Sequence, residues 1–208
     1  MIIRAIEPRD DAAMAAIVRR SLEAHGLNVP GTAYFDPELD HLSAHYGAAT
    51  DRTYFVAEKD GEVVGGAGCS PVPGADGVAE LQKLYVAAAW RHRGIARGLT
   101  AAVEEFARTA GFSTLYLETH HDLVAAVALY RALGYRESGE PLPSSLHTAM
   151  DVFFEKSLLG PSSENGPGPP PKTYPIVSRA APARPTASLF PAPFLNQPRR
   201  SSRVLPAA

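Results

Sequence analysis

The sequence has little cysteine and no long apolar run. Cys69 is the only cysteine among 208 residues, so no disulfide can form within the chain and nothing points to an oxidising compartment. No uninterrupted apolar stretch approaches the roughly 18 residues that a membrane-spanning helix needs. The N-terminal stretch MIIRAIEPRDD lacks a basic segment followed by an apolar one, so we predict no signal peptide. We therefore expect a cytoplasmic protein that makes no contact with a membrane.

The net charge is also small, at −2, but it is unevenly distributed. Residues 160–208 hold six cations and one acid, a charge of +5, which leaves −7 on residues 1–159. An acidic globular part argues against nucleic acid as a ligand and favours a cationic substrate. A solvated acidic surface without a ligand is the alternative interpretation.

The composition changes abruptly after Leu159. Twelve of the 19 prolines fall in the last 48 residues, and this segment has too few apolar side chains to offset the entropy of ordering it. We predict one globular domain over residues 1–159, which is long enough for a substantial core. We predict a mostly disordered tail with polyproline stretches over residues 160–208, and the role of this tail is left open.

Strands and helices alternate through the first 159 residues, which indicates an α/β domain without internal repeats. Apolar runs predict strands, and apolar residues at helical spacing followed by glycine predict helices. Asp60-Gly61 between two apolar runs predicts a tight hairpin turn, and Asp36 before Pro37 predicts a helix N-terminus. The predicted strands are 1–6, 77–87, 113–119 and 148–158, with a hairpin over 52–70; the predicted helices are 7–25, 37–47, 94–110 and 123–133.

The stretch QKLYVAAAWRHRGIARGL places cations around one glycine, between a predicted strand and a predicted helix. The first turn of a helix leaves N–H groups unpaired and carries partial positive charge, so it attracts anions. Gly94 and Ala96 leave the backbone open to a phosphate, and nearby arginines add charge-assisted contacts. Neither a Walker loop nor a Rossmann fingerprint is present, so R-x-x-G-x-A at this turn is the candidate polyphosphate site. A solvated arginine cluster is the alternative.

This arrangement resembles the acetyl-coenzyme A site of the GCN5-related N-acetyltransferase (GNAT) family, whose hallmark is Q/R-x-x-G-x-G/A at such a turn. A second family feature, ALYRALGY, is present at 128–135, and the order of predicted elements matches over residues 1–158. The resemblance implies a GNAT fold, in which a central mixed, mostly antiparallel sheet is splayed between two parallel strands and flanked by helices. It also implies that pantetheine pairs with the backbone of Leu84 and Val86 and that the coenzyme pyrophosphate binds the turn, at Arg91, His92, Arg93, Gly94, Ile95, Ala96 and Arg97.

The resemblance also suggests which groups act in the reaction. Acetyl transfer from a thioester to an amine needs a neutral amine and a proton for the departing thiolate. Tyr130 occupies the family's general-acid position. The alternative interpretation is that Tyr130 only packs in the core. Glu80, six residues before Val86, matches the base of the histone-acetylating branch of the family. Period-2 alternation places it on one strand face with Gln82, Leu84 and Val86.

Other residues compete with Glu80 for the role of base. Glu118 and His120 on the neighbouring strand are alternatives, and a salt bridge to Lys83 is a purely structural role for Glu80. The histidine pair His120-His121 also raises the question of a metal. Adjacent histidines seldom point at one ion, and no further cysteine or distant histidine completes a ligand set, so we predict no metal site.

The chain departs from the family pattern at one position. Many members have an asparagine seven residues before the tyrosine, but Leu123 stands there in this sequence. That coenzyme contact is therefore absent or comes from His121 or Asp122. Cys69 is expected to be a small buried apolar residue, because no base that would activate its thiol can be identified.

Residues 21–50 and 137–150 are expected to shape the acceptor site, as in the family. The sequence thus predicts an acetyl-coenzyme A-dependent N-acetyltransferase that moves the acetyl group directly, in a ternary complex, to a primary amine of a small molecule or peptide. A non-catalytic acyl-coenzyme A sensor or scaffold is the main alternative, and a nucleic-acid-binding protein is disfavoured by the acidic domain. Formation of a homodimer is left open. The segment 21–50 offers an acidic and aromatic wall suited to an amine: Tyr34, Phe35, Asp36, Glu38 and Asp40.

Overall fold

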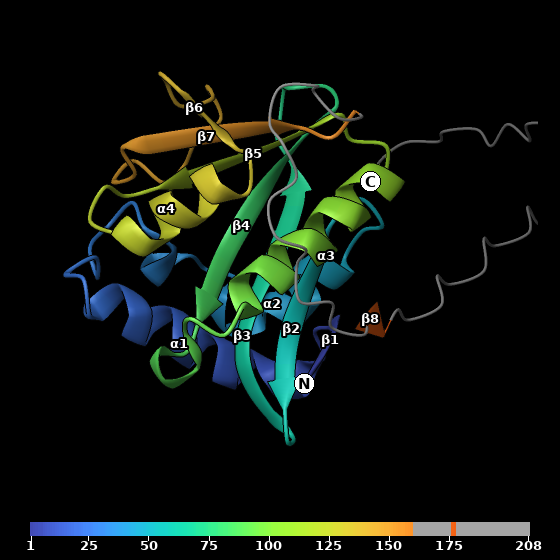
Figure 1. Ribbon diagram of the computed structural model, residues 1–208, viewed down its shortest axis with the longest axis vertical. Coiled ribbons are helices and arrows are strands. Elements are labelled where there is room, and N and C mark those ends of the chain that lie inside the picture. Colours follow the sequence, from blue (N-terminus) through green and yellow to red (C-terminus); the bar gives the residue numbers. More distant parts are fainter. Residues whose placement is uncertain (160–175, 178–208) are drawn as a thin grey trace, which may run out of the picture.

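The computed structural model describes residues 1–159 and the backbone of residues 176–177. Over these residues the chain forms eight strands and four α-helices (Figure 1). The strands are β1 (Ile2–Ala5), β2 (Thr53–Lys59), β3 (Glu62–Pro71), β4 (Val78–Val86), β5 (Thr114–Thr119), β6 (Arg136–Ser138), β7 (Val152–Ser157) and β8 (Ile176–Val177). The helices are α1 (Asp11–Glu23), α2 (Leu42–Gly47), α3 (Ile95–Thr109) and α4 (Val124–Ala132), with short 3-10 turns at Pro8–Asp10, Ala33–Phe35, Leu39–His41 and Ala88–Trp90.

All eight strands form one sheet, in the order β6-β7-β5-β4-β3-β2-β1-β8. Neighbours are antiparallel except for two parallel pairs, β4 with β5 and β1 with β8. β4 and β5 pair only between residues 78–80 and 114–116, near the start of each strand. Beyond these residues the two strands spread apart towards their carboxyl ends (Figure 1). The predicted mixed, mostly antiparallel sheet, splayed between two parallel strands, is confirmed.

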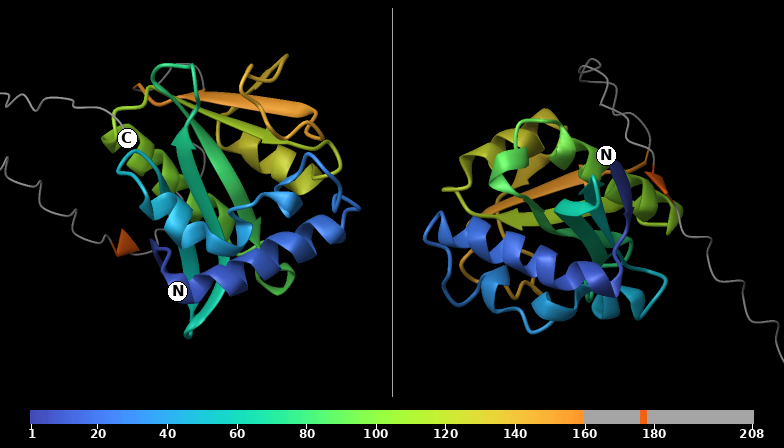
Figure 2. Two further views of the ribbon diagram at one scale, coloured as in Figure 1. Left: turned by 180° about the vertical axis from the view of Figure 1, so that it is seen from behind. Right: turned by 90° about the horizontal axis from the view of Figure 1, so that it is seen from below.

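Helices cover both faces of the sheet. α3 and α4 lie on one face, and α1 and α2 lie on the other (Figures 1 and 2). Apolar residues of α3 pack against the sheet in one core cluster, which includes Leu99, Val103 and Leu115. A second cluster, which includes Met14 and Leu42, joins α1 and α2 to the opposite face. Because the sheet is buried on both faces, packing fixes the positions of the diverging ends of β4 and β5.

The predicted hairpin forms with the turn chemistry that the sequence indicates. Asp60 and Gly61 both have positive φ, at 53° and 85°. This is the backbone geometry that a two-residue turn needs between right-handed twisted strands. β2 and β3 flank the turn as predicted.

Two sequence expectations need correction. The helix predicted over 37–47 forms only from Leu42 to Gly47, after a 3-10 turn. Asp36 caps no helix, because its carboxylate instead contacts Lys83 and His147. The sequence also did not predict β6, which has only three residues.

The predicted disordered tail, residues 160–208, lies outside the described residues except for β8. The backbone of β8 pairs in parallel with Ile3 and Arg4 of β1. A domain boundary at residue 159 stays a prediction. Among the residues that the structure describes, no helix combines the length and the apolar character required to cross a bilayer.

Candidate active site

A cavity of about 290 Å³ adjoins the carboxyl end of β4. The loop after β4 and the first turn of α3 form part of its wall, and α4 forms another part. α1 contributes Ser21, and the turn after α1 contributes His25. Nine residues were predicted to contact the coenzyme, and all of them except Arg93 line this cavity. The eight that line it are Leu84, Val86, Arg91, His92, Gly94, Ile95, Ala96 and Arg97.

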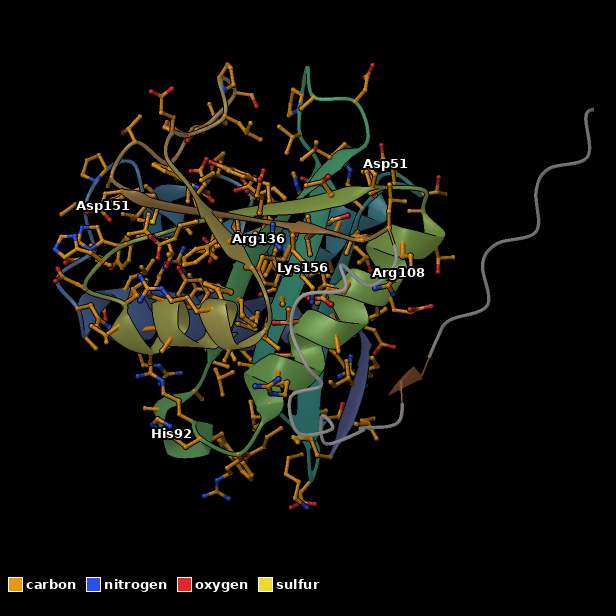
Figure 3. The ribbon with its side chains drawn as sticks, turned by 45° about the horizontal axis from the view of Figure 1, so that its top comes forward. Asp51, His92, Arg108, Arg136, Asp151 and Lys156 are labelled. Atoms are coloured by element: carbon orange, nitrogen blue, oxygen red, sulfur yellow. The ribbon has the colours of Figure 1, made fainter. Side chains whose placement is uncertain are left out.

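The glycine of the predicted phosphate turn is the N-cap residue of α3. Gly94 has φ +82°, in the left-handed region that residues with a Cβ rarely adopt. No side chain caps this end of the helix, so the first N–H groups of α3 keep their hydrogen-bonding capacity. His92, two residues earlier, also has positive φ, at 60°, and Figure 3 shows it on the loop that leads into α3. Outside tight turns, such backbone conformations of non-glycine residues cluster at functional sites.

Two arginines of the turn have different partners. Arg91 donates from Nε to the carbonyl oxygen of Val86 (3.2 Å) and from Nη2 to Oγ of Ser21 (3.4 Å). Its guanidinium therefore links the end of β4 to α1 beside the cavity. Arg93 instead places its guanidinium over the Trp90 ring, 4.8 Å from the ring centroid.

β4 contains a β-bulge at Lys83. The φ of Lys83 is +50°, and the register with β3 shifts at this point. Gly68 pairs with Gln82 and Gly66 pairs with Tyr85, so β4 has two residues between these pairs where β3 has one. A bulge of this kind inverts the alternation of side chains beyond it.

The bulge makes the predicted common face of Glu80 and Val86 wrong. Gln82 lies with Glu80 on the side of α2, where it accepts a hydrogen bond from Tyr46. Val86 packs instead in the core cluster on the α3 side, and Leu84 packs against the same cluster. Strict alternation counted from the sequence therefore fails after Gln82.

A second cavity, of about 350 Å³, adjoins the same strand. Gln82 and Lys83 line the second cavity, whereas the next two residues, Leu84 and Tyr85, line the first. Further walls come from residues 36–38 and from the loop that precedes β7. Both segments belong to the regions that the sequence predicts to shape the acceptor site.

The predicted acidic and aromatic wall is only partly present. Asp36 and Glu38 line the second cavity, but the other three side chains do not. Tyr34 and Asp40 form hydrogen bonds with side chains of α1 instead. Phe35 is 58% exposed and lies outside the cavity lining.

Glu80 lines the second cavity and is held by Gln82. Gln82 donates from Nε2 to Oε2 of Glu80 (2.8 Å), while the hydroxyl groups of Tyr46 (2.7 Å) and Ser70 (3.1 Å) donate to Oε1 of Gln82. The two hydroxyl donors orient the amide so that its NH₂ group faces the carboxylate. Burial raises the pKa of Glu80; the Gln82 hydrogen bond opposes this effect, and the charge of Glu118 adds to it.

The salt bridge between Glu80 and Lys83, considered as a purely structural role for Glu80, does not form. Nζ of Lys83 lies 2.6 Å from Asp36 and 2.9 Å from Glu38, and only 2% of its side chain is exposed. Asp36 also pairs with Nε2 of His147 (3.1 Å). Burial opposes ionisation of Asp36, but the contacts with His147 and Lys83 prevail and lower its pKa. The hydrogen bond with Asp36 in turn raises the pKa of His147.

Glu118 reaches the same cavity from β5. Its Oε1 accepts a hydrogen bond from the Tyr116 hydroxyl (3.0 Å), and its Oε2 accepts one from Oγ of Ser145 (2.8 Å). One ligand atom each of Glu80, Glu118 and His147 lies within 4.8 Å of the other two. The cavity therefore presents two carboxylates and an imidazole to whatever enters it.

Three further candidate residues line neither cavity. Tyr130 is 6% exposed, its ring lies against Tyr135 and Phe154, and burial raises its pKa. Cys69 is fully buried as expected, and burial raises its pKa to about 12. His120, the alternative base, lies on the loop that follows β5.

Sequence reasoning missed several residues of the two cavities. No local motif marks Ser21 or His25, because α1 reaches the first cavity only through the tertiary fold. Gln82 was identified only as a strand-face neighbour of Glu80. His147 is the single histidine of residues 137–150, one of the two segments predicted to shape the acceptor site, and this is the one signal that could have identified it.

Comparisons with known proteins define the class to which this fold and site belong. The sequence profile of the Acetyltransferase (GNAT) family matches residues 21–135. The uncharacterized N-acetyltransferase YjgM of Escherichia coli (strain K12) is 36% identical over 159 residues, which cover 76% of this chain and 95% of that protein. The chain therefore belongs to the GNAT acetyltransferase family. As predicted, it is an acyltransferase whose acetyl donor is acetyl-coenzyme A.

Two further similarities agree with this assignment. N-acetyltransferase 8B of Rattus norvegicus is 36% identical over 120 residues, which cover 56% of this chain and 54% of that protein. This chain thus spans about half the length of that relative. The crystal structure of ribosomal-protein-alanine N-acetyltransferase from Brucella melitensis superposes with a TM-score of 0.60 at 27% identity, covering 76% of this chain and 99% of that one.

Proposed function

We propose that the protein transfers the acetyl group of acetyl-coenzyme A directly to a primary amine, in a complex that holds both substrates. The observation that carries this proposal is the position of the two cavities, which adjoin consecutive residues of β4. Direct transfer requires the thioester carbon and the amine nitrogen to meet. A donor in the first cavity and an acceptor in the second would meet beside residues 82–85.

The first cavity suits coenzyme A for two reasons. The uncapped N-terminus of α3 at Gly94 offers N–H groups and partial positive charge to the pyrophosphate, and Arg91 and Arg97 add charge-assisted contacts. Among the described residues, β4 pairs with β5 only as far as Glu80. The backbone of residues 84–86 is therefore open on that side to the amide groups of pantetheine.

Glu80 is the base in this proposal. An ammonium substrate must lose a proton before it can attack, and a carboxylate accepts that proton best when its pKa lies near the working pH. Burial moves the pKa of Glu80 in this direction. The proton passes from the ammonium to Oε1, the oxygen that Gln82 does not contact, directly or through one water. The charge of Glu118 attracts the cationic form of the substrate to the same place.

Tyr130 is the acid in this proposal: it does not line the first cavity itself, but its hydroxyl interacts electrostatically with that of Tyr85, which does. As the amine nitrogen attacks the thioester carbonyl, the carbon–sulfur bond breaks, and the departing sulfur takes the hydroxyl proton of Tyr130. The acetylated nitrogen then loses its second proton, which restores the Tyr130 hydroxyl directly or through water. Burial keeps this hydroxyl protonated at neutral pH, as an acid requires. A covalent route through Cys69 finds no support, because a buried thiol with a pKa of about 12 forms little thiolate.

Free-thiol release from acetyl-coenzyme A tests the proposal. The panel of acceptors comprises a polyamine, amino acids, an aminoglycoside and a peptide that begins with alanine. Release with one of these amines, and initial rates that give intersecting rather than parallel double-reciprocal lines, would support direct transfer. Coenzyme binding without release from any amine would favour the non-catalytic sensor instead.

Two glycine variants separate coenzyme binding from folding. Gly94→Val should weaken coenzyme binding at least tenfold, because the variant must strain φ and also places a side chain against the phosphates. Gly111→Val is the matched control, since Gly111 has φ +92° at the other end of α3 and open space around it. Both variants should lose about 1–2 kcal/mol of stability. Equal coenzyme affinity in the two would refute the pyrophosphate assignment.

A further inference from the structure

We propose that His120, His121 and Asp122, with Asp151 behind them, form a binding site for one divalent transition-metal ion such as Zn²⁺. The three consecutive residues occupy the loop between β5 and α4. Asp151 directly precedes β7, the strand that pairs with β5, and is labelled in Figure 3. This site lies apart from both cavities and does not depend on the acetyl-transfer proposal.

The ligand atoms have the spacing of a metal's coordination shell. Nε2 of His121 lies 3.3 Å from Oδ1 of Asp122, and Nδ1 of His120 lies 3.5 Å from Oδ2 of the same carboxylate. A tetrahedral zinc site with metal–ligand distances of about 2.0–2.1 Å has ligand atoms about 3.3 Å apart. One ligand atom from each of the three residues lies within 4.8 Å of the other two.

The sequence argument against a metal fails here for a structural reason. Neighbouring side chains point to opposite faces within a strand, but His120 and His121 follow the last residue of β5. Their rings lie side by side, with 4.2 Å between centroids and 31° between planes. The two rings therefore lie next to each other rather than on opposite faces, and their nitrogens are near enough to share one ion.

The facing atoms carry lone pairs rather than protons when the rings are neutral. Nδ1 of His121 contacts Oδ2 of Asp151, which places the ring proton on Nδ1 and leaves the lone pair on Nε2. Nδ1 of His120 accepts a long hydrogen bond from the backbone N–H of Asp122 (3.2 Å), so it also carries a lone pair, and a bound ion would take the place of that N–H. The site thus offers two imidazole lone pairs and a carboxylate within 4.8 Å of one another, and a bound cation would balance them.

Asp151 is an independent sign of preorganisation. It accepts a second hydrogen bond, from the backbone N–H of His121 (2.9 Å), and its own N–H donates to the carbonyl oxygen of Thr119 (3.1 Å). A carboxylate that accepts from the far nitrogen of a metal-bound imidazole orients the ring and makes it a stronger ligand. The sheet therefore holds one ligand of the site in position before any ion arrives.

The ligand set selects the class of ion. Two imidazoles and one carboxylate suit Zn²⁺, Co²⁺, Ni²⁺ or Cu²⁺, whereas Mg²⁺ and Ca²⁺ prefer oxygen ligands alone. The ion would join the end of β5 to the residue before α4, Leu123, which lines the coenzyme cavity. Its binding should accordingly stiffen that part of the cavity wall.

A second group, Glu80, Glu118 and His147, also has ligand atoms within 4.8 Å of one another. Each of its three members already holds a hydrogen bond through a carboxylate or ring atom, whereas in the loop site one long bond, from the N–H of Asp122 to Nδ1 of His120, has to be replaced. Both oxygens of Glu118 accept hydrogen bonds, one oxygen of Glu80 accepts from an amide, and Nε2 of His147 pairs with Asp36. We therefore assign the metal to the loop and use the second group as the competing site in the test.

The test is a Zn²⁺ titration of the full chain without an affinity tag, in competition with a chromophoric chelator. Residues 161–208 contain no histidine or cysteine that could compete. We expect one ion per chain, at least tenfold weaker binding in His121→Ala, and about 10- to 100-fold weaker binding in Asp151→Asn. His41→Ala, at an exposed histidine elsewhere, and His147→Ala, in the competing group, should both bind like the wild type.

Three results would overturn the proposal. The first is no Zn²⁺ binding by the wild type at neutral pH. The second is unchanged affinity in His121→Ala, and the third is loss of binding in His147→Ala with retention in His121→Ala. Replacement of Zn²⁺ by Co²⁺ provides a separate readout, because the visible absorption of a four-coordinate nitrogen and oxygen site should disappear in His121→Ala.

Discussion

Replacement of Gln82 by methionine should move the acid limb of the pH–rate profile to higher pH. Gln82 donates a hydrogen bond of 2.8 Å to the carboxylate of Glu80, and this bond favours the ionised form. Methionine keeps the approximate length of the side chain but has no N–H group. The pKa of Glu80, which burial already raises, should therefore rise further.

The structure allows the size of this shift to be worked out. A hydrogen bond to a charged group contributes about 1.5–3 kcal/mol, and one pKa unit corresponds to about 1.36 kcal/mol. Glu80 lines an open cavity and keeps part of its surface in solvent, so the lower figure applies and the shift should be about one unit. At pH values below both pKa values, kcat/KM should then fall about tenfold relative to the wild type. The two rates should converge on the alkaline plateau.

The assay is thiol release with a saturating donor, with kcat/KM for the acceptor amine measured across pH. Ser70→Ala is the matched control, because it removes one donor to the Gln82 amide oxygen and leaves Tyr46 in place. Its acid limb should move much less than that of Gln82→Met. An unmoved acid limb in Gln82→Met would refute Glu80 as the base, whereas a uniform loss of rate at every pH would indicate damage to packing alone.

Three further predictions rest on named contacts. Lys83→Met should cost about 3–5 kcal/mol in urea unfolding, because it leaves the carboxylates of Asp36 and Glu38 without their buried cation; a loss below about 1 kcal/mol would contradict this. Tyr130→Phe should lower kcat about 100-fold or more with little change in coenzyme Kd, and small equal changes would mean a packing role. The pKa of His147 is raised, so its pair with Asp36 stabilises the fold below about pH 6.5 and is lost as pH rises through the raised value. His147→Gln should therefore destabilise more at pH 6 than at pH 9, and an equal cost at both would contradict the ion pair.

Most of the secondary structure could be predicted because it depends on short-range patterns. Asp60-Gly61 forms a hairpin turn because both residues tolerate positive φ. α3 starts after Gly94 and presents one apolar stripe, so its length and its buried face follow from spacing alone. The turn between β4 and α3 could be identified for the same reason, since cations, a glycine and a helix start are adjacent in the chain.

The arrangement of β4 could not be predicted from alternation. One extra residue at Lys83 inverts the faces beyond it, so that Glu80 and Val86 lie on opposite sides of the sheet. A count of period two has no means of detecting a bulge, because the bulge depends on pairing with β3. The same limit applies to Asp36, whose capping pattern is overridden by Lys83, a residue distant in sequence.

The sequence by itself therefore determined the order of most elements, the glycine turn between β4 and α3 and the family, because each depends on residues that are neighbours in the chain. The tertiary structure alone decided which side chains share a cavity. Glu80, Gln82 and Glu118 meet His147 because β4, β5 and the loop before β7 come together at one end of the sheet. The tertiary structure also decided that His120 and His121 both face the carboxylate of Asp122. β5 ends before these two residues, so their side chains do not alternate between the faces of the sheet. Contacts between distant segments depend on how packed layers place strand ends, and no local pattern encodes that placement.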